Sequence, residues 1–132
     1  MKVLALDHGR ARTGVAVSDP TGTIVRPLPA IRHVDSAAGR EALAQVIARE
    51  EPEAIVVGDP RSLSGERGSQ ARAAGGFAGR LRGRVTVPVH MWDERLTTVE
   101  AKRRGAEGGS RADLDSMAAC VLLEAYLSGR ND

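Results

Sequence analysis

Three acidic residues of this chain, Asp7, Glu94 and Asp115, could together support metal chemistry. Asp7 ends the apolar run at residues 2–7, and burying a carboxylate there without a partner costs several kcal/mol. A divalent cation would neutralise that charge, because Mg²⁺ and Mn²⁺ prefer oxygen ligands. With two ions about 4 Å apart, one activates an attacking water and the other stabilises the leaving oxygen. The three residue types therefore favour metal-assisted hydrolysis of a phosphate ester.

Each of these acids also has an ordinary structural interpretation. Asp7 could be a turn aspartate beside Gly9, and Glu94 could pair with a neighbouring arginine at the surface. Asp115 could be an acidic residue in the first turn of a helix, where the helix dipole favours negative charge. What favours a common site is the order of elements, because it brings all three acids to one end of the predicted sheet.

Three further aspartates lie at the ends of predicted strands. Asp93 precedes Glu94, and the sequence does not decide which of the two faces a metal. Asp59 could be an accessory acid near the site, although a turn before Pro60 explains it equally well. Asp19 ends the second predicted strand away from the site, and we interpret it as a turn residue.

Positive charge is concentrated in the second half of the chain. Residues 61–104 carry ten Arg or Lys and four Asp or Glu, so this segment has a net charge of +6 within a chain of net charge +2. A basic segment can follow a phosphate backbone, although 17 arginines among 19 basic residues could also reflect a general preference for arginine. The candidate phosphate contacts are Arg12, Arg61, Arg67 and Arg95.

The elements that must position these residues can be read from hydrophobic patterns. Apolar runs and alternation predict strands, and apolar residues three or four apart predict helices. The predicted strands are 2–7, 12–17, 23–31, 54–58 and 85–91, and the predicted helices are 40–50, 70–81, 97–104 and 114–128. Pro27 and Pro29 place the third strand at an edge or a strand end, Thr97 and Thr98 would begin the third helix, and Asp113 would N-cap the last.

This order predicts an α/β protein. Three consecutive strands form a meander, and the alternating helices and strands that follow extend the sheet in parallel. The expected architecture is a mixed five-stranded sheet flanked by helices. At 132 residues the prior is a single domain spanning residues 1–132.

Composition excludes several classes of protein. No apolar run approaches the ~18 residues that cross a bilayer, and the N-terminus lacks the succession of segments that marks a signal peptide. The single cysteine, Cys120, lies in an apolar stretch and is expected in the core. Three aromatic residues are too few for a broad base-stacking platform. We therefore expect a cytoplasmic protein that is not associated with membranes.

Four segments, in order and spanning nearly the whole chain, resemble the motifs of the YqgF/RuvX family. The segments are residues 6–19 (LDHGRARTGVAVSD), 56–65 (VVGDPRSLSG), 93–101 (DERLTTVEA) and 115–127 (DSMAACVLLEAYL). The third is the most specific of them. Two residues depart from the usual pattern: His8 replaces an apolar residue, and Asp59 replaces a leucine and adds negative charge near the site.

The resemblance implies a ribonuclease H-like fold and a metal-dependent endonuclease that matures the 5′ end of 16S ribosomal RNA from its precursor. The family's acidic positions correspond to Asp7, Glu94 and Asp115, which would be both the catalytic residues and the ligands of Mg²⁺ or Mn²⁺, with two ions expected. The substrate could be free precursor RNA or RNA within an assembling ribosomal particle.

Other functions stay open at this stage. The same chemistry on branched DNA would make the protein a Holliday junction resolvase, which needs a dimer to place two symmetric nicks; the sequence does not distinguish a monomer from a dimer. A nucleic-acid-binding module without catalysis is a third reading, although all three acids are present. An actin-like kinase or ATPase needs two lobes around its nucleotide, and this chain supplies one.

Overall fold

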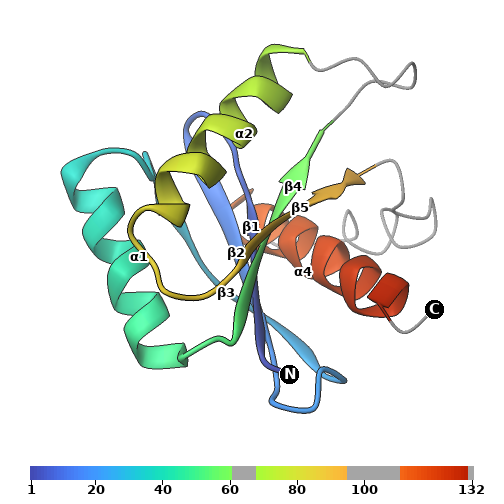
Figure 1. The fold of residues 1–132 in the computed structure, drawn as a ribbon. Coiled ribbons are helices and arrows are strands. Elements are labelled where there is room, and N and C mark those ends of the chain that lie inside the picture. The colour runs from blue at the N-terminus through green and yellow to red at the C-terminus, as the bar shows by residue number, and fades with distance from the viewer. Residues whose placement is uncertain (61–67, 95–110, 131–132) are drawn as a thin grey trace.

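The computed structural model describes residues 1–60, 68–94 and 111–130, and in the last segment it describes the side chains of residues 116–129. Five strands form one mixed sheet in the order β3-β2-β1-β4-β5 (Figure 1). Their bounds are β1 Val3–Asp7, β2 Arg12–Ser18, β3 Val25–Arg32, β4 Ala54–Asp59 and β5 Val89–Asp93. The expected mixed five-stranded sheet is thus confirmed.

The strand directions bring three strand ends together. β1 pairs antiparallel with β2, and β2 pairs antiparallel with β3, as a meander requires. On its other side β1 pairs in parallel with β4, and β4 in parallel with β5. The carboxyl ends of β1, β4 and β5 therefore lie at the same edge of the sheet, where α/β proteins place their ligands.

Helices cover both faces of the sheet (Figure 1). α1 (Ala37–Glu50) and α2 (Ser69–Arg82) pack on one face, with Leu43 and Phe77 among their buried residues. α4 (Arg111–Arg130) packs on the opposite face, and Leu123 and Tyr126 contribute to its core. Cys120 is buried in this second core, as expected.

Side-chain alternation along the strands assigns residues to these faces. In β1, Leu4 and Leu6 belong to the core under α1 and α2, whereas Val3 and Ala5 belong to the core under α4. The alternation continues to the end of the strand, so Asp7 faces the side of α4. His8 faces the side of α2, where its ring stacks on Phe77 with 4.9 Å between ring centroids.

Several predicted boundaries move in the structure. β5 begins at Val89, four residues later than predicted, because Val85 and Val87 are apolar for another reason: they pack against the core from an irregular segment. α1 begins at Ala37 rather than 40, because the Ser36 hydroxyl accepts a hydrogen bond from the Gly39 amide at 3.0 Å and caps the helix there.

The start of α4 also differs from the prediction. This helix begins at Arg111, so Asp113 lies inside it and is not its N-cap. The helix predicted over 97–104 lies outside the described residues. Two other expectations are confirmed, because β3 is an edge strand and Asp19 is a turn residue whose carboxylate accepts hydrogen bonds from the Thr23 and Ile24 amides.

A buried carboxylate joins three elements at the opposite end of the sheet from the strand ends described above. Glu50 is 7% exposed, and its oxygens lie 3.2 Å from Lys2 Nζ, 2.8 Å from Arg26 Nη2 and 3.3 Å from Arg49 Nε. Burial alone would raise the pKa of Glu50, but the hydrogen bonds from Lys2 and Arg49 and the charge of Arg26 outweigh it and lower the pKa. The cluster ties α1 to β1 and β3. Within the described residues, no helix has the length and apolarity that crossing a membrane requires.

Candidate active site

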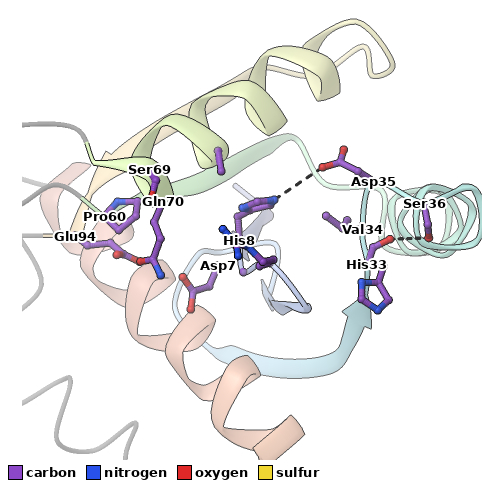
Figure 2. A pocket seen from close by; sticks show the side chains of 13 residues that line it. Asp7, His8, His33, Val34, Asp35, Ser36, Pro60, Ser69, Gln70 and Glu94 are labelled. Carbon is purple, nitrogen blue, oxygen red and sulfur yellow. Dashed lines mark hydrogen bonds and ion pairs between the residues drawn. The ribbon is translucent and has the colours of Figure 1, made fainter.

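A cavity of about 780 Å³ opens beside the carboxyl ends of β1 and β4 (Figure 2). The turn after β1, the connection from β3 to α1, the first turns of α2 and the end of β5 form its walls. Its lining residues are Asp7, His8, Gly9, Arg10, His33, Val34, Asp35, Ser36, Pro60, Ser69, Gln70, Ala73 and Glu94. Two of the three predicted acids, Asp7 and Glu94, thus line one cavity.

The position of Asp7 follows from β1. It is the last residue of a strand whose other four residues are fully buried, and it pairs with Gly14 of β2. Its own side chain is partly exposed, because the strand ends at the cavity. The strand therefore fixes the backbone of Asp7 rigidly while its carboxylate stays accessible from the cavity.

The position of Glu94 depends on a glycine in the neighbouring strand. A Cβ atom added to Gly58 of β4 would lie 2.7 Å from Glu94 Oε1 and 3.3 Å from its carboxyl carbon. Glu94 thus lies over the face of β4 where any larger residue would have a side chain. Val57 belongs to the core under α1 and α2, so Gly58 and the Glu94 side chain lie on the opposite face, with Asp7.

Glu94 and its neighbour Asp93 lie on opposite faces of the sheet. Asp93 ends β5 in register with Asp59, the last residue of β4. Alternation from Met91 and Val57 places both aspartates on the face of α1 and α2. Neither lines the cavity. Within the described residues, the geometry therefore does not support the accessory role that we considered for Asp59.

The third predicted acid, Asp115, lies in the second turn of α4, and its side chain is outside the described residues. Its neighbour Ser116 is 2% exposed and donates a hydrogen bond from its hydroxyl to the Leu28 carbonyl of β3 at 2.5 Å. This bond anchors the beginning of α4 to the sheet face that also presents Asp7. Among the described side chains, no three acids or other metal-binding groups come together.

One of the four predicted phosphate contacts, Arg12, lies among the described residues. Arg12 begins β2 and does not line the cavity. Arg61, Arg67 and Arg95 lie outside the described residues.

The structure adds polar residues that sequence reasoning missed. Arg10, His33 and Gln70 all line the cavity, and Figure 2 shows Gln70 reaching from α2 toward the region of the Asp7 and Glu94 carboxylates. Arg10 lies inside the first family-like motif and could have been noticed there. His33 and Gln70 belong to segments without any local signal, and only the folded chain brings them to the site.

One wall of the cavity is held by a charged cluster. The Asp35 carboxylate accepts two hydrogen bonds from Arg80 of α2, at 3.2 and 2.9 Å, and lies 4.0 Å from His8 Nε2. Burial lowers the pKa of the His8 imidazole; nearby Asp35 opposes this shift and Arg80 adds to it. The cluster links the turn after β1 to α1 and α2, which together bound the cavity.

Solved structures of other proteins share the fold of this chain. The chain shares the ribonuclease H-like fold of Thermus thermophilus RuvC, solved in complex with a Holliday junction, with a TM-score of 0.60 and 19% identity over 99% of this chain and 96% of the other. It also shares the fold of the fowlpox virus resolvase, with a TM-score of 0.54 and 9% identity over the full length of both chains. The fold implied by the sequence motifs is thereby confirmed.

The chain belongs to the RuvX family, whose model, described as "Holliday junction resolvase", matches residues 1–129. A relative from Moorella thermoacetica is 41% identical over 96% of this chain and 94% of its own length. A relative from Thermobifida fusca is 43% identical over 92% of this chain and 83% of its own. Both are named "Putative pre-16S rRNA nuclease". The family is one of nucleases, which confirms the enzyme class expected from the sequence.

Proposed function

We propose that this protein is a divalent-metal-dependent endonuclease that processes the 5′ end of precursor 16S ribosomal RNA in the cytoplasm. The observation that carries the proposal is that Asp7 and Glu94 line one cavity from the same face of the sheet. The names of the relatives supply the substrate, because they specify precursor 16S RNA.

The residues present fit a metal centre. Oxygen ligands are what Mg²⁺ and Mn²⁺ prefer, and the space that Gly58 leaves lets the Glu94 carboxylate lie against the sheet on the side of Asp7. We assign Asp7, Glu94 and Asp115 as ligands, with α4 supplying the third from its packed position over the same face. Two bound ions would supply positive charge for an attacking water and for the leaving oxygen.

The protein's own contribution is to position groups before the reaction begins. β1 fixes the backbone of Asp7 at the end of a buried strand, so this part of the site does not have to be ordered when substrate binds. The product would carry a 3′-hydroxyl and a 5′-phosphate if water attacks the scissile phosphorus in line with the 3′ oxygen. Arg12, Arg61, Arg67 and Arg95 stay proposed contacts to the RNA backbone.

A second function is favoured by the description of the family model, which names a Holliday junction resolvase. The same acids would then cut branched DNA. This function requires two active sites related by a two-fold axis, and hence a dimer. The mass of the protein in solution, measured with and without a four-way junction, separates this alternative from a nuclease that acts as a monomer.

A cleavage assay tests the proposal directly. The purified protein is given single-stranded RNA spanning a precursor 16S 5′ end, and in parallel a four-way DNA junction, with Mn²⁺ and then with Mg²⁺. We expect cleavage of the RNA that Asp7→Asn abolishes while its circular dichroism spectrum stays unchanged. Activity retained in Asp7→Asn would refute the assignment of the metal site.

The other outcomes are equally informative. Paired, symmetric cuts in the junction without RNA cleavage would show the resolvase function. If neither substrate is cut, the assay is repeated on precursor ribosomal particles, and failure there would leave a binding module without catalysis.

A further inference from the structure

The cavity is larger than a metal centre requires. Its volume of about 780 Å³ extends from Asp7 and Glu94 past the turn after β1 to the connection between β3 and α1. A divalent ion and its water ligands fill only a part of such a space. We call the part of the cavity away from Asp7 and Glu94 its far end. The residues that line this far end should indicate what else the cavity holds.

Cationic and hydrogen-bond-donating side chains line this far part. Arg10 and His33 both line the cavity, and in the described part of the chain neither side chain makes a hydrogen bond or an ion pair. His33 has a backbone φ of 46°, the left-handed region that few residues other than glycine adopt. Its carbonyl accepts the Ser36 hydroxyl at 2.7 Å, which holds this conformation at the start of α1.

The one carboxylate in this part of the cavity is already paired. Asp35 is engaged by two nitrogens of Arg80, so its charge is largely compensated. The first turn of α1 carries no acidic residue, and its helix dipole adds positive potential nearby. The two ends of the cavity thus differ: two carboxylates lie at one end, and uncompensated Arg10 lies with His33 at the other.

We infer that the cavity binds two consecutive phosphates of the substrate strand, with the scissile phosphate at Asp7 and Glu94 and its neighbour at Arg10 and His33. This inference rests on the proposed nuclease function and adds a second subsite to it. A phosphodiester suits the far end, because an arginine fork donates two parallel hydrogen bonds to phosphate oxygens. Such a contact fixes the register of the strand without reading its bases.

The first test measures binding, so its result does not depend on cleavage. A fluorescent 12-nucleotide single-stranded RNA is titrated with protein in the Asp7→Asn background over a range of salt concentrations. Loss of one phosphate contact lowers the slope of log affinity against log salt by about 0.7 for a single strand. We expect this decrease, with about tenfold weaker binding, for Arg10→Ala.

Matched variants separate the subsite from a general loss of charge. Arg84→Ala removes an exposed arginine that does not line the cavity, and it should leave the slope unchanged. His33→Asn keeps a residue that tolerates the left-handed backbone, and it should weaken binding less than Arg10→Ala. An unchanged slope for Arg10→Ala, or an equal decrease for Arg84→Ala, would overturn the inference.

The second test locates the phosphate. Once the bond cut by the wild-type protein is mapped, uncharged methylphosphonates replace the phosphates on its 5′ or 3′ side, one at a time. At one of these two positions the substitution should raise KM for the wild type about tenfold and have no effect on Arg10→Ala. Equal penalties in both proteins at both positions would refute the subsite, whereas failure of the wild type to cut any substrate would refute the proposed function instead.

Discussion

At the scale of single residues, Gly58 determines where a candidate metal ligand can lie. The Glu94 carboxylate occupies the space of the missing Cβ, 2.7 Å away. Gly58→Ala should therefore displace Glu94 while leaving the buried strand β4 intact, and we expect cleavage to fall by at least about tenfold, since a misplacement of 1 Å can cost 10²-fold. The measurement is the initial rate of cleavage at saturating Mn²⁺, with the melting temperature followed in parallel.

Gly79 provides the control for this variant. A Cβ there meets nothing within 4 Å, and the residue lies on the exposed side of α2. Gly79→Ala should keep full activity and gain roughly 0.5–1 kcal/mol of stability from its higher helix propensity. If Gly58→Ala keeps the wild-type rate, Glu94 is not held where it is needed for catalysis.

At the scale of secondary-structure elements, α1 is held to the sheet through Glu50. Glu50→Gln removes a charge that three cations contact, and we expect it to lower the free energy of unfolding by about 1–3 kcal/mol at pH 7. Because the pKa of Glu50 is lowered in the folded state, its contribution is fully present above the ordinary value of 4.5 and is lost as the pH falls through the folded-state pKa. Urea unfolding at pH 7 and pH 3 should thus show a difference that shrinks on acidification.

Glu41→Gln is the matched control, because Glu41 is exposed on the same helix and its described contact is with Gln45, at 3.2 Å. It should change stability by less than about 0.5 kcal/mol at either pH. If Glu50→Gln lowers the free energy of unfolding equally at pH 7 and pH 3, the ionised form of Glu50 does not provide the stabilisation.

Among the described residues, a buried hydrogen bond from Ser116 joins the first turns of α4 to β3. Ser116→Ala leaves the Leu28 carbonyl without its donor, which should cost about 1–3 kcal/mol. The same variant should raise the Mn²⁺ concentration needed for half-maximal cleavage, because α4 carries Asp115 beside this bond. Ser128 is exposed near the other end of α4, so Ser128→Ala should change neither the stability nor the Mn²⁺ concentration needed for cleavage. A loss of stability without any change in Mn²⁺ dependence would separate this anchor from the metal site.

Sequence patterns predicted the elements better than they predicted the site. The buried strands β1 and β4 give clear apolar runs in the sequence, because their side chains pack into cores on both faces of the sheet. β5 was placed too early because Val85 and Val87 face the core without being in a strand. The order of the motifs predicted that Asp7 and Glu94 lie near each other, and both line the cavity. Which of Glu94 and Asp93 lies on the face of Asp7 could be read only from the alternation of side chains along β5 and from the space that Gly58 leaves. Arg10 and His33 meet only through tertiary structure, which no local pattern encodes.

At the scale of the whole molecule, metal binding and folding should be coupled. The proposed ligands come from β1, from the end of β5 and from α4, so an ion would connect three elements distant in sequence. Addition of Mn²⁺ at 100 times its dissociation constant should stabilise the folded state by about 2.7 kcal/mol. Differential scanning fluorimetry should show this as a rise in melting temperature that EDTA reverses and that Asp7→Asn lacks. An equal rise in both proteins would place the ion elsewhere.

The contact between Trp92 and Gly129 has a practical consequence. Trp92 is the single tryptophan of the chain, its indole packs edge-on against Tyr126 with 5.6 Å between ring centroids, and a Cβ at Gly129 would collide with it. The indole thus lies between the last strand and the end of α4, two residues before Glu94. Its emission is therefore an intrinsic optical reporter of whether α4 is seated on the sheet, and stopped-flow fluorescence can time that docking against substrate binding without any attached label.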